Sequence, residues 1–195
     1  MKRIERYRQL AKFSKSGAIT RRYFATNAFD GTLTIIGLVL GSYFAIILNP
    51  LTVVRAGIGA CIAMMFSGFA GTFFAERLIQ REQIQELEKA MLRKLNKTLP
   101  SRASNFVIVT SALVDGVAPL ITSLVCLIPI IIAALGIIAW NLAVFISSII
   151  GLTILFILGF YIGRAARMNP WFQGLQTFFI GIGTAIAIII VQIAI

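Results

Sequence analysis

The chain alternates long apolar stretches with short basic ones. A transmembrane helix needs roughly 20 apolar residues to cross about 30 Å of hydrocarbon, and four stretches reach that length. The longest holds two spans, with a turn predicted at Gly136 and at the interfacial pair Trp140 and Asn141. The chain is therefore predicted to be an all-α membrane protein, a bundle of five transmembrane helices. The predicted spans are 28–48, 56–75, two within 103–163, and 171–195.

Basic residues are confined to one side of this predicted bundle. Of the 18 Lys and Arg residues, 8 precede Tyr23, 7 lie within 77–102 and 2 lie between the fourth and fifth spans, whereas Arg55 alone falls in the other connections. The positive-inside rule predicts a cytoplasmic N-terminus, and an odd number of spans then leaves the C-terminus outside. The predicted organisation is a basic cytoplasmic amphipathic segment over 1–22, transmembrane helices over 23–75, a cytoplasmic helical connection over 76–102 and transmembrane helices over 103–195.

Composition narrows the class of protein further. Apolar residues make up 58% of the 195 residues and charged residues only 13%, which excludes a water-soluble globular domain. A net charge of +11 could suit nucleic acid, but its placement between apolar spans indicates a multi-pass protein of the cell membrane, with lipid and not nucleic acid as its partner. The lack of histidine excludes Ser-His-Asp triads and imidazole ligands, and no cofactor is expected. Cys61 and Cys126 lie in apolar runs and are interpreted as packing residues.

Two predicted cytoplasmic segments have helical periodicity. The first fits either a helix lying on an anionic membrane surface or a solvated leader that only sets topology; its apolar residues are Ile4, Tyr7, Leu10 and Phe13. The second continues the second span past Glu76 and carries an apolar stripe of Ile84, Leu87, Met91 and Leu95. Glu82 and Glu86 lie one turn apart on another face, either as candidate metal ligands or as part of a solvated face.

Two carboxylates and a thioether inside the predicted spans are candidates for chemistry. A charged side chain near the bilayer centre costs at least about 2.5–3.5 kcal/mol, so it is usually kept for an ion pathway, a proton relay or a buried pair. Helix rise places Asp115 and Met65 near the midplane and Asp30 closer to the cytoplasm. Asp30 shares a helix face with Gly37 and Gly41, where another helix, a second copy included, can approach closely. The alternatives are that Asp30 caps or unwinds its helix and that Met65 only fills space.

The first two spans resemble those of the vacuolar iron transporter family. The run Asn27-Ala28-Phe29-Asp30-Gly31, followed by Leu38-Val39-Leu40-Gly41, is similar to that family's first-span signature. Met65, followed by Ser67-Gly68 and closed by Ala75-Glu76, resembles the family's Met-x-x-Gly helix, and Leu127-Ile128-Pro129 resembles its Leu-Ile-Pro. The number of predicted spans agrees with that family as well.

The resemblance implies a homodimeric exporter of a divalent metal ion, ferrous iron or manganese, driven by protons moving the other way. The family's intramembrane aspartate and methionine correspond to Asp30 and Met65, whereas its second-span glutamate falls at Gly57. One carboxylate per chain neutralises a dication poorly. We therefore predict that Asp115 faces the bundle interior and joins Asp30 and Met65 as a metal ligand. The alternative is that Asp115 pairs locally, for example with the hydroxyls of Thr110 or Ser111 or with Arg55.

Two other functions fit parts of the sequence. A non-transporting scaffold or assembly protein would use the basic cytoplasmic face. An intramembrane enzyme would use the Asp-Gly dipeptide as lipid phosphotransferases do, but those enzymes need further acidic residues in the same span, so we expect no enzymatic activity. Metal-dependent flux distinguishes the transporter from the scaffold.

Overall fold

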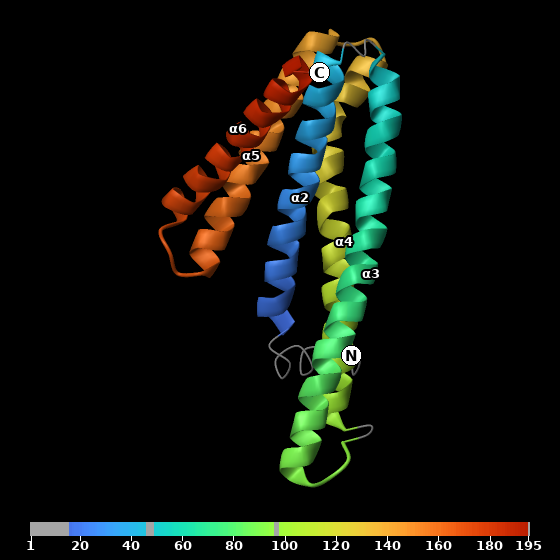
Figure 1. Cartoon of the computed structure of the whole chain (residues 1–195), viewed down its shortest axis with the longest axis vertical. Helices are drawn as coiled ribbons and strands as arrows, with labels where there is room; N and C mark the ends of the chain where they lie inside the picture. Colours follow the sequence, from blue (N-terminus) through green and yellow to red (C-terminus); the bar gives the residue numbers. More distant parts are fainter. Residues whose placement is uncertain (1–15, 46–48, 96–97, 195) are drawn as a thin grey trace, which may run out of the picture. The chain divides into compact units, whose positions relative to one another are not determined.

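A computed structural model describes residues 16–45, 49–95 and 98–194, and it contains five long helices within these ranges (Figure 1). All five are long and apolar enough to cross a membrane, which confirms the predicted all-helical, five-span architecture. The amphipathic helix predicted before residue 16 lies outside the described residues. The helices are α2 (Ser16–Phe44), α3 (Pro50–Met91), α4 (Leu99–Ala134), α5 (Trp140–Ala165) and α6 (Pro170–Ala194).

Two helices each begin at an Asn-Pro dipeptide. The side-chain Oδ1 of Asn49 accepts a hydrogen bond from the Leu51 amide at 3.0 Å, and Asn169 Oδ1 accepts one from the Trp171 amide at 3.1 Å. Each asparagine thereby caps a helix whose first residue is a proline, Pro50 in α3 or Pro170 in α6. Proline suits that position because its φ is already helical and the missing N–H would have had no partner.

Three helices end where one residue adopts a left-handed conformation. The residues with positive φ are Leu92, Gly136 and Arg167, after α3, α4 and α5. In each case the next residue's amide bonds the carbonyl five positions back, as in Ile137 to Ile132 at 3.3 Å. This Schellman arrangement satisfies carbonyls that the helix leaves free, and it confirms the turn predicted at Gly136.

Helices α2 and α3 are longer than the apolar stretches that predicted them. The helix α2 already exists at Ser16, well before residue 28, and α3 continues without interruption through Glu76 to Met91. No proline follows Pro50 within α3, so nothing stops the helix where apolar sequence gives way to charged sequence. The predicted extension of the second span past Glu76 is confirmed.

The chain forms two compact units, and three helices run from one into the other. Unit 1 contains the residues up to Phe24 together with Met65–Val117, and unit 2 contains Ala25–Met64 and Ala118–Ile195. Unit 2 holds the apolar core, where α2, α3, α4 and α5 meet at side chains such as Ile35, Val53, Leu127 and Ala143. Cys61 and Cys126 are buried free thiols in this core, which confirms their packing role.

Small residues let α5 and α6 pack closely within unit 2. A Cβ atom on Gly174 would lie 3.1 Å from the Phe156 carbonyl oxygen, and one on Gly163 would lie 2.8 Å from the Pro170 Cα. The Thr177 hydroxyl donates to the Leu155 carbonyl at 2.9 Å across the same interface. Such small-residue contacts replace the hydrophobic effect as the force between helices in lipid, and α5 and α6 accordingly lie side by side (Figure 1).

Candidate functional site

Polar residues four positions apart line one face of α3 within unit 1. The residues Thr72, Glu76 and Gln80 share that face because helical residues at i and i+4 lie one above the other, and all three are buried. On α4, Ser111 and Asp115 repeat the spacing and are buried as well. We call these side chains, together with the half-buried Tyr23 of α2, the polar ladder of unit 1.

Asp115 is held by a hydroxyl on the neighbouring helix. The Thr72 Oγ1 donates a hydrogen bond to Asp115 Oδ2 at 2.5 Å, and only 3% of Asp115 is exposed. The hydroxyl that pairs with Asp115 belongs to α3 and is not one of the local hydroxyls expected from the sequence, since Thr110 donates to the Phe106 carbonyl and Ser111 Oγ has no partner among the described residues. In a low-dielectric interior, a hydrogen bond to a carboxylate fixes the orientation of that carboxylate, and removing the bond is costly in free energy.

The backbones of α3 and α4 approach closely at this carboxylate. A Cβ on Gly116 would lie 2.7 Å from the Met65 carbonyl oxygen, and a Cβ on Gly68 would lie 3.1 Å from the Asp115 carbonyl oxygen. A Cβ at Gly116 would force the two backbones apart, and one at Gly68 would need them to give by a few tenths of an ångström. Pro119 has no N–H to bond the Asp115 carbonyl, so that oxygen lacks its usual donor from the next helical turn.

Glu76 joins α2 to α3. Tyr23 of α2 donates its hydroxyl to Glu76 Oε1 at 3.0 Å, and the Gln80 amide nitrogen donates to Glu76 Oε2 at 3.3 Å. Both carboxylate oxygens accept a hydrogen bond, and only 2% of the residue is exposed. The sequence interpretation treated Glu76 as the start of a cytoplasmic connection, so it missed Glu76 and its partner Tyr23 as candidates.

Ser111 lies one helical turn before Asp115 on α4, at the level of Glu76 on α3. The antiparallel pairing that joins Thr72 to Asp115 places Glu76 at the level of Ser111, one helical turn away. Among the residues that the structure describes, the fully buried Ser111 Oγ has no hydrogen-bond partner. Its hydroxyl is a free donor and acceptor within a ladder of oxygen atoms.

The other candidates from the sequence lie elsewhere. Glu82 and Glu86 are exposed on the α3 extension. Met65 is half-buried, and its backbone faces Gly116 beside Asp115. Asp30 is exposed on α2 in unit 2, and its carbonyl accepts the Thr34 hydroxyl at 2.8 Å. In the described ranges, no three His, Cys, Asp or Glu residues form a group suited to hold a metal ion.

Asp30 lies in an unbroken helix next to a close crossing. The alternative that Asp30 caps or unwinds its helix is wrong, because α2 is helical on both sides of it. A Cβ on Gly31 would lie 2.7 Å from the Pro119 Cα, and the Ser123 hydroxyl donates to the Gly31 carbonyl at 3.0 Å. Both Asp-Gly dipeptides of the chain therefore place an aspartate next to a glycine at which two helices touch.

Gly37 and Gly41, the glycines on the same face of α2 as Asp30, lie against α6 in unit 2. A Cβ on Gly37 or Gly41 would meet side chains of α6, Ile188 and Gln192, at the ordinary contact distances of 3.5 and 3.6 Å. The small-residue face of α2 thus packs on a helix of the same chain. A Cβ on Gly57 would lie 2.8 Å from a methyl group of Leu127, so Leu127 fills the space that a longer side chain at this position would need.

The chain was compared with protein families, with other proteins and with solved structures. The model that describes the VIT family matches residues 75–192. An uncharacterized protein of Methanocaldococcus jannaschii is 28% identical over 165 residues, which cover 83% of this chain and 82% of that protein. No solved structure matches the chain. Glu76 and Asp115 lie inside the matched range, whereas Asp30 and Met65 precede it.

Proposed function

The chain belongs to the VIT family, and from that premise we propose that this integral membrane transporter moves a divalent metal ion, ferrous iron or manganese, out of the cytoplasm in exchange for protons. The observation that supports this proposal best is the polar ladder, in which Asp115 and Glu76 are buried carboxylates one helical turn apart in register. Burying carboxylates in a membrane protein is costly, so such residues are usually kept for ion or proton movement.

The ladder offers the ligand chemistry that such an ion needs. The carboxylate of Asp115 and the hydroxyl groups of Thr72 and Ser111 are hard oxygen ligands, which suit Mn²⁺ more than Cu⁺. The thioether of Met65 would add a soft ligand that favours a transition metal such as Fe²⁺ over Mg²⁺. Two negative charges on the ladder would balance a dication inside a low-dielectric region.

Glu76 is our candidate for the proton-exchanging group. Its carboxylate accepts hydrogen bonds from Tyr23 and Gln80, and a tyrosine hydroxyl both donates and accepts. When a proton binds Glu76 Oε1, the Tyr23 hydroxyl can turn from donor to acceptor, so this hydrogen bond can be kept in both protonation states. The family resemblance adds Asp30, and we propose that its charge is required for metal to enter the transport cycle.

We propose that the working unit is a homodimer. Within the single chain, only 11% of the most apolar 18-residue segment of α3 is buried, and only 6% of the corresponding segment of α6. These helices therefore offer apolar surface both to lipid and to a second copy. Chemical crosslinking in native membranes, before detergent is added, would give a dimer band; crosslinks that yield only monomer contradict this part of the proposal.

Reconstituted vesicles test the transport proposal directly. Purified protein in proteoliposomes that contain a metal-quenched dye should show Mn²⁺ or Fe²⁺ flux, and Asp115→Asn should lower that flux at least about tenfold, because the lost charge no longer balances the dication. Arg164→Gln is the control, since that charged side chain is exposed and lies outside the ladder.

Each outcome of this experiment assigns a role. Glu76→Gln should leave metal flux that no longer responds to a pH gradient. Flux that is absent from the unaltered protein with every divalent ion tried would favour the scaffold, and wild-type flux in Asp115→Asn would show that this carboxylate is structural.

A further inference from the structure

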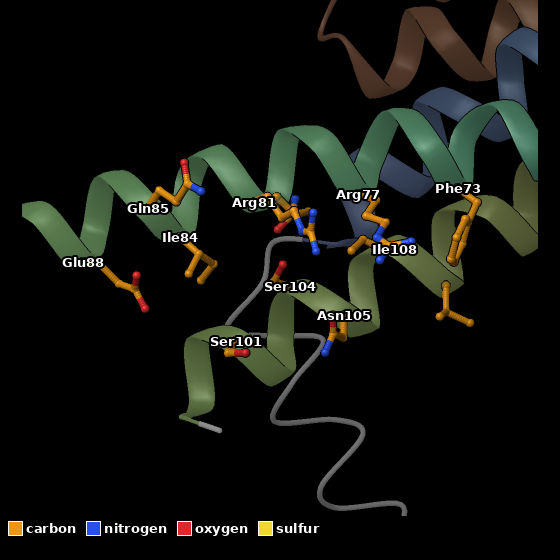
Figure 2. Close-up of a pocket in the computed structure, with 12 residues that line it drawn as sticks. Phe73, Arg77, Arg81, Ile84, Gln85, Glu88, Ser101, Ser104, Asn105 and Ile108 are labelled. Atoms are coloured by element: carbon orange, nitrogen blue, oxygen red, sulfur yellow. The ribbon is translucent and has the colours of Figure 1, made fainter. Parts of the chain in front are cut away.

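A polar cleft opens between α3 and α4 in unit 1, next to the polar ladder but lined by different groups apart from Gln80. The cleft has a volume of about 730 Å³ and is lined by Phe73, Arg77, Gln80, Arg81, Ile84, Gln85, Glu88, Ser101, Ser104, Asn105, Ile108 and Val109. In Figure 2, Arg77 and Arg81 extend from α3 toward α4, where Ser104 and Asn105 lie below them. We propose that this cleft binds the phosphate of an anionic phospholipid headgroup.

The charges in the cleft favour an anion. Arg77 and Arg81 lie one turn apart on the same helix face, so both guanidinium groups can reach one phosphate, which they bind in a bidentate manner. Glu88 is the single acidic residue of the lining, and its Oε1 is occupied by the Leu95 amide at 2.7 Å. The balance of charge at the arginine end of the cleft is therefore positive.

Uncharged donors complete the phosphate site. Ser101, Ser104 and Asn105 belong to the first two turns of α4, across from the arginines. Hydroxyl and amide groups donate to phosphate oxygens, and the amino-terminal end of a helix carries partial positive charge that stabilises an anion nearby. The arginines and these donors come from two different helices and converge on one space (Figure 2).

The gradient of polarity along the cleft fits a lipid better than a soluble anion. One end is lined by Phe73, Ile108 and Val109, and the arginines follow within one or two turns. Leu78, in the same turn as Arg77, is 65% exposed. A helix turn with an exposed apolar side chain beside a guanidinium is typical of the membrane–water boundary, where arginine reaches the headgroups.

Native mass spectrometry of the full chain tests the proposal without metal. The unaltered protein in detergent should bind dioleoylphosphatidylglycerol in preference to dioleoylphosphatidylcholine. Replacing both arginines, Arg77→Gln with Arg81→Gln, should weaken phosphatidylglycerol binding about thirtyfold, the combined effect of two basic side chains beside an anionic lipid. The matched control is Arg164→Gln with Arg167→Gln, because these exposed arginines are three positions apart outside the cleft, and it should leave binding unchanged.

The other outcomes overturn the proposal. Equal losses in both double variants would show attraction to surface charge alone, and equal binding of the two lipids would show that the headgroup charge is not recognised. Inorganic phosphate that displaces phosphatidylglycerol completely would make the cleft a soluble-anion site. Arg77→Lys with Arg81→Lys keeps the charge and should retain part of the binding, which separates recognition from misfolding. Since neither metal nor flux is measured, failure of the transport proposal leaves this test unaffected.

Discussion

The hydrogen bond between Thr72 and Asp115 can be measured as a free energy. Thr72→Val removes the hydroxyl that donates to Asp115 Oδ2 and keeps the β-branched shape. Hydrogen bonds to charged groups contribute about 1.5–3 kcal/mol in soluble proteins, whereas pairs between membrane helices average about 0.6 and reach about 1.7 kcal/mol. Thr72 and Asp115 are 5% and 3% exposed and the acceptor is a carboxylate, so we expect the upper part of the membrane range, about 1.5 kcal/mol.

Reversible unfolding in mixed dodecylmaltoside and SDS micelles, followed by far-UV circular dichroism, measures this loss. Thr153→Val is the matched control, because Thr153 is exposed on α5 and its hydroxyl bonds the Ile149 carbonyl of its own helix at 2.8 Å. A double-mutant cycle of Thr72→Val with Asp115→Asn isolates the pair. If Thr72→Val costs no more than Thr153→Val, or if the cycle gives no coupling energy, the bond does not stabilise the protein and the polar ladder loses its central contact.

Three further predictions concern packing, transport and topology. Gly116→Ala should destabilise the protein by about 1–3 kcal/mol, because the added Cβ would meet the Met65 carbonyl. Gly71→Ala should instead stabilise α3 by about 0.5–1 kcal/mol, because a Cβ there has nothing within 4 Å. Equal effects of the two variants on unfolding in micelles would contradict the close crossing of α3 and α4. Asp30→Asn should fold normally in size-exclusion chromatography but lose metal flux in proteoliposomes, and retained flux would remove Asp30 from the mechanism. A reporter fused after Ile195 should be active only outside the cytoplasm, and cytoplasmic activity would invert the predicted orientation.

The spans could be predicted because the bilayer sets their length. The turn predicted at Gly136 exists because a residue with left-handed backbone follows the end of α4 there. The early part of α2 was missed because hydropathy measures apolar content and polar residues do not stop a helix, whereas the continuation of α3 past Glu76 was predicted from its helical periodicity. Arg21 and Arg22 lie inside α2 for this reason.

The candidate site could be predicted in part. An aspartate at depth in an apolar stretch must be buried or paired, and Asp115 is both. Its donor could not be predicted, because Thr72 is 43 positions away and the pairing depends on the register of α3 against α4. Gly68 and Gly116 allow the close approach that sets this register. In the sequence they look like other helical glycines, such as Gly59 and Gly71, where an added Cβ would meet nothing within 4 Å.

Glu76 shows which sequence signal was overlooked. A carboxylate at the end of an apolar stretch is normally assigned to water, but Glu76 continues the four-residue spacing of Gly68 and Thr72, and this spacing predicts the same helix face. Its burial also needs Tyr23, which reaches it only because α2 is helical before its apolar part begins. At Gly57, Leu127 occupies the space that a glutamate would need. The buried carboxylates that this chain does have on α3 and α4, Glu76 and Asp115, are therefore the ones whose removal most directly tests whether it carries a dication.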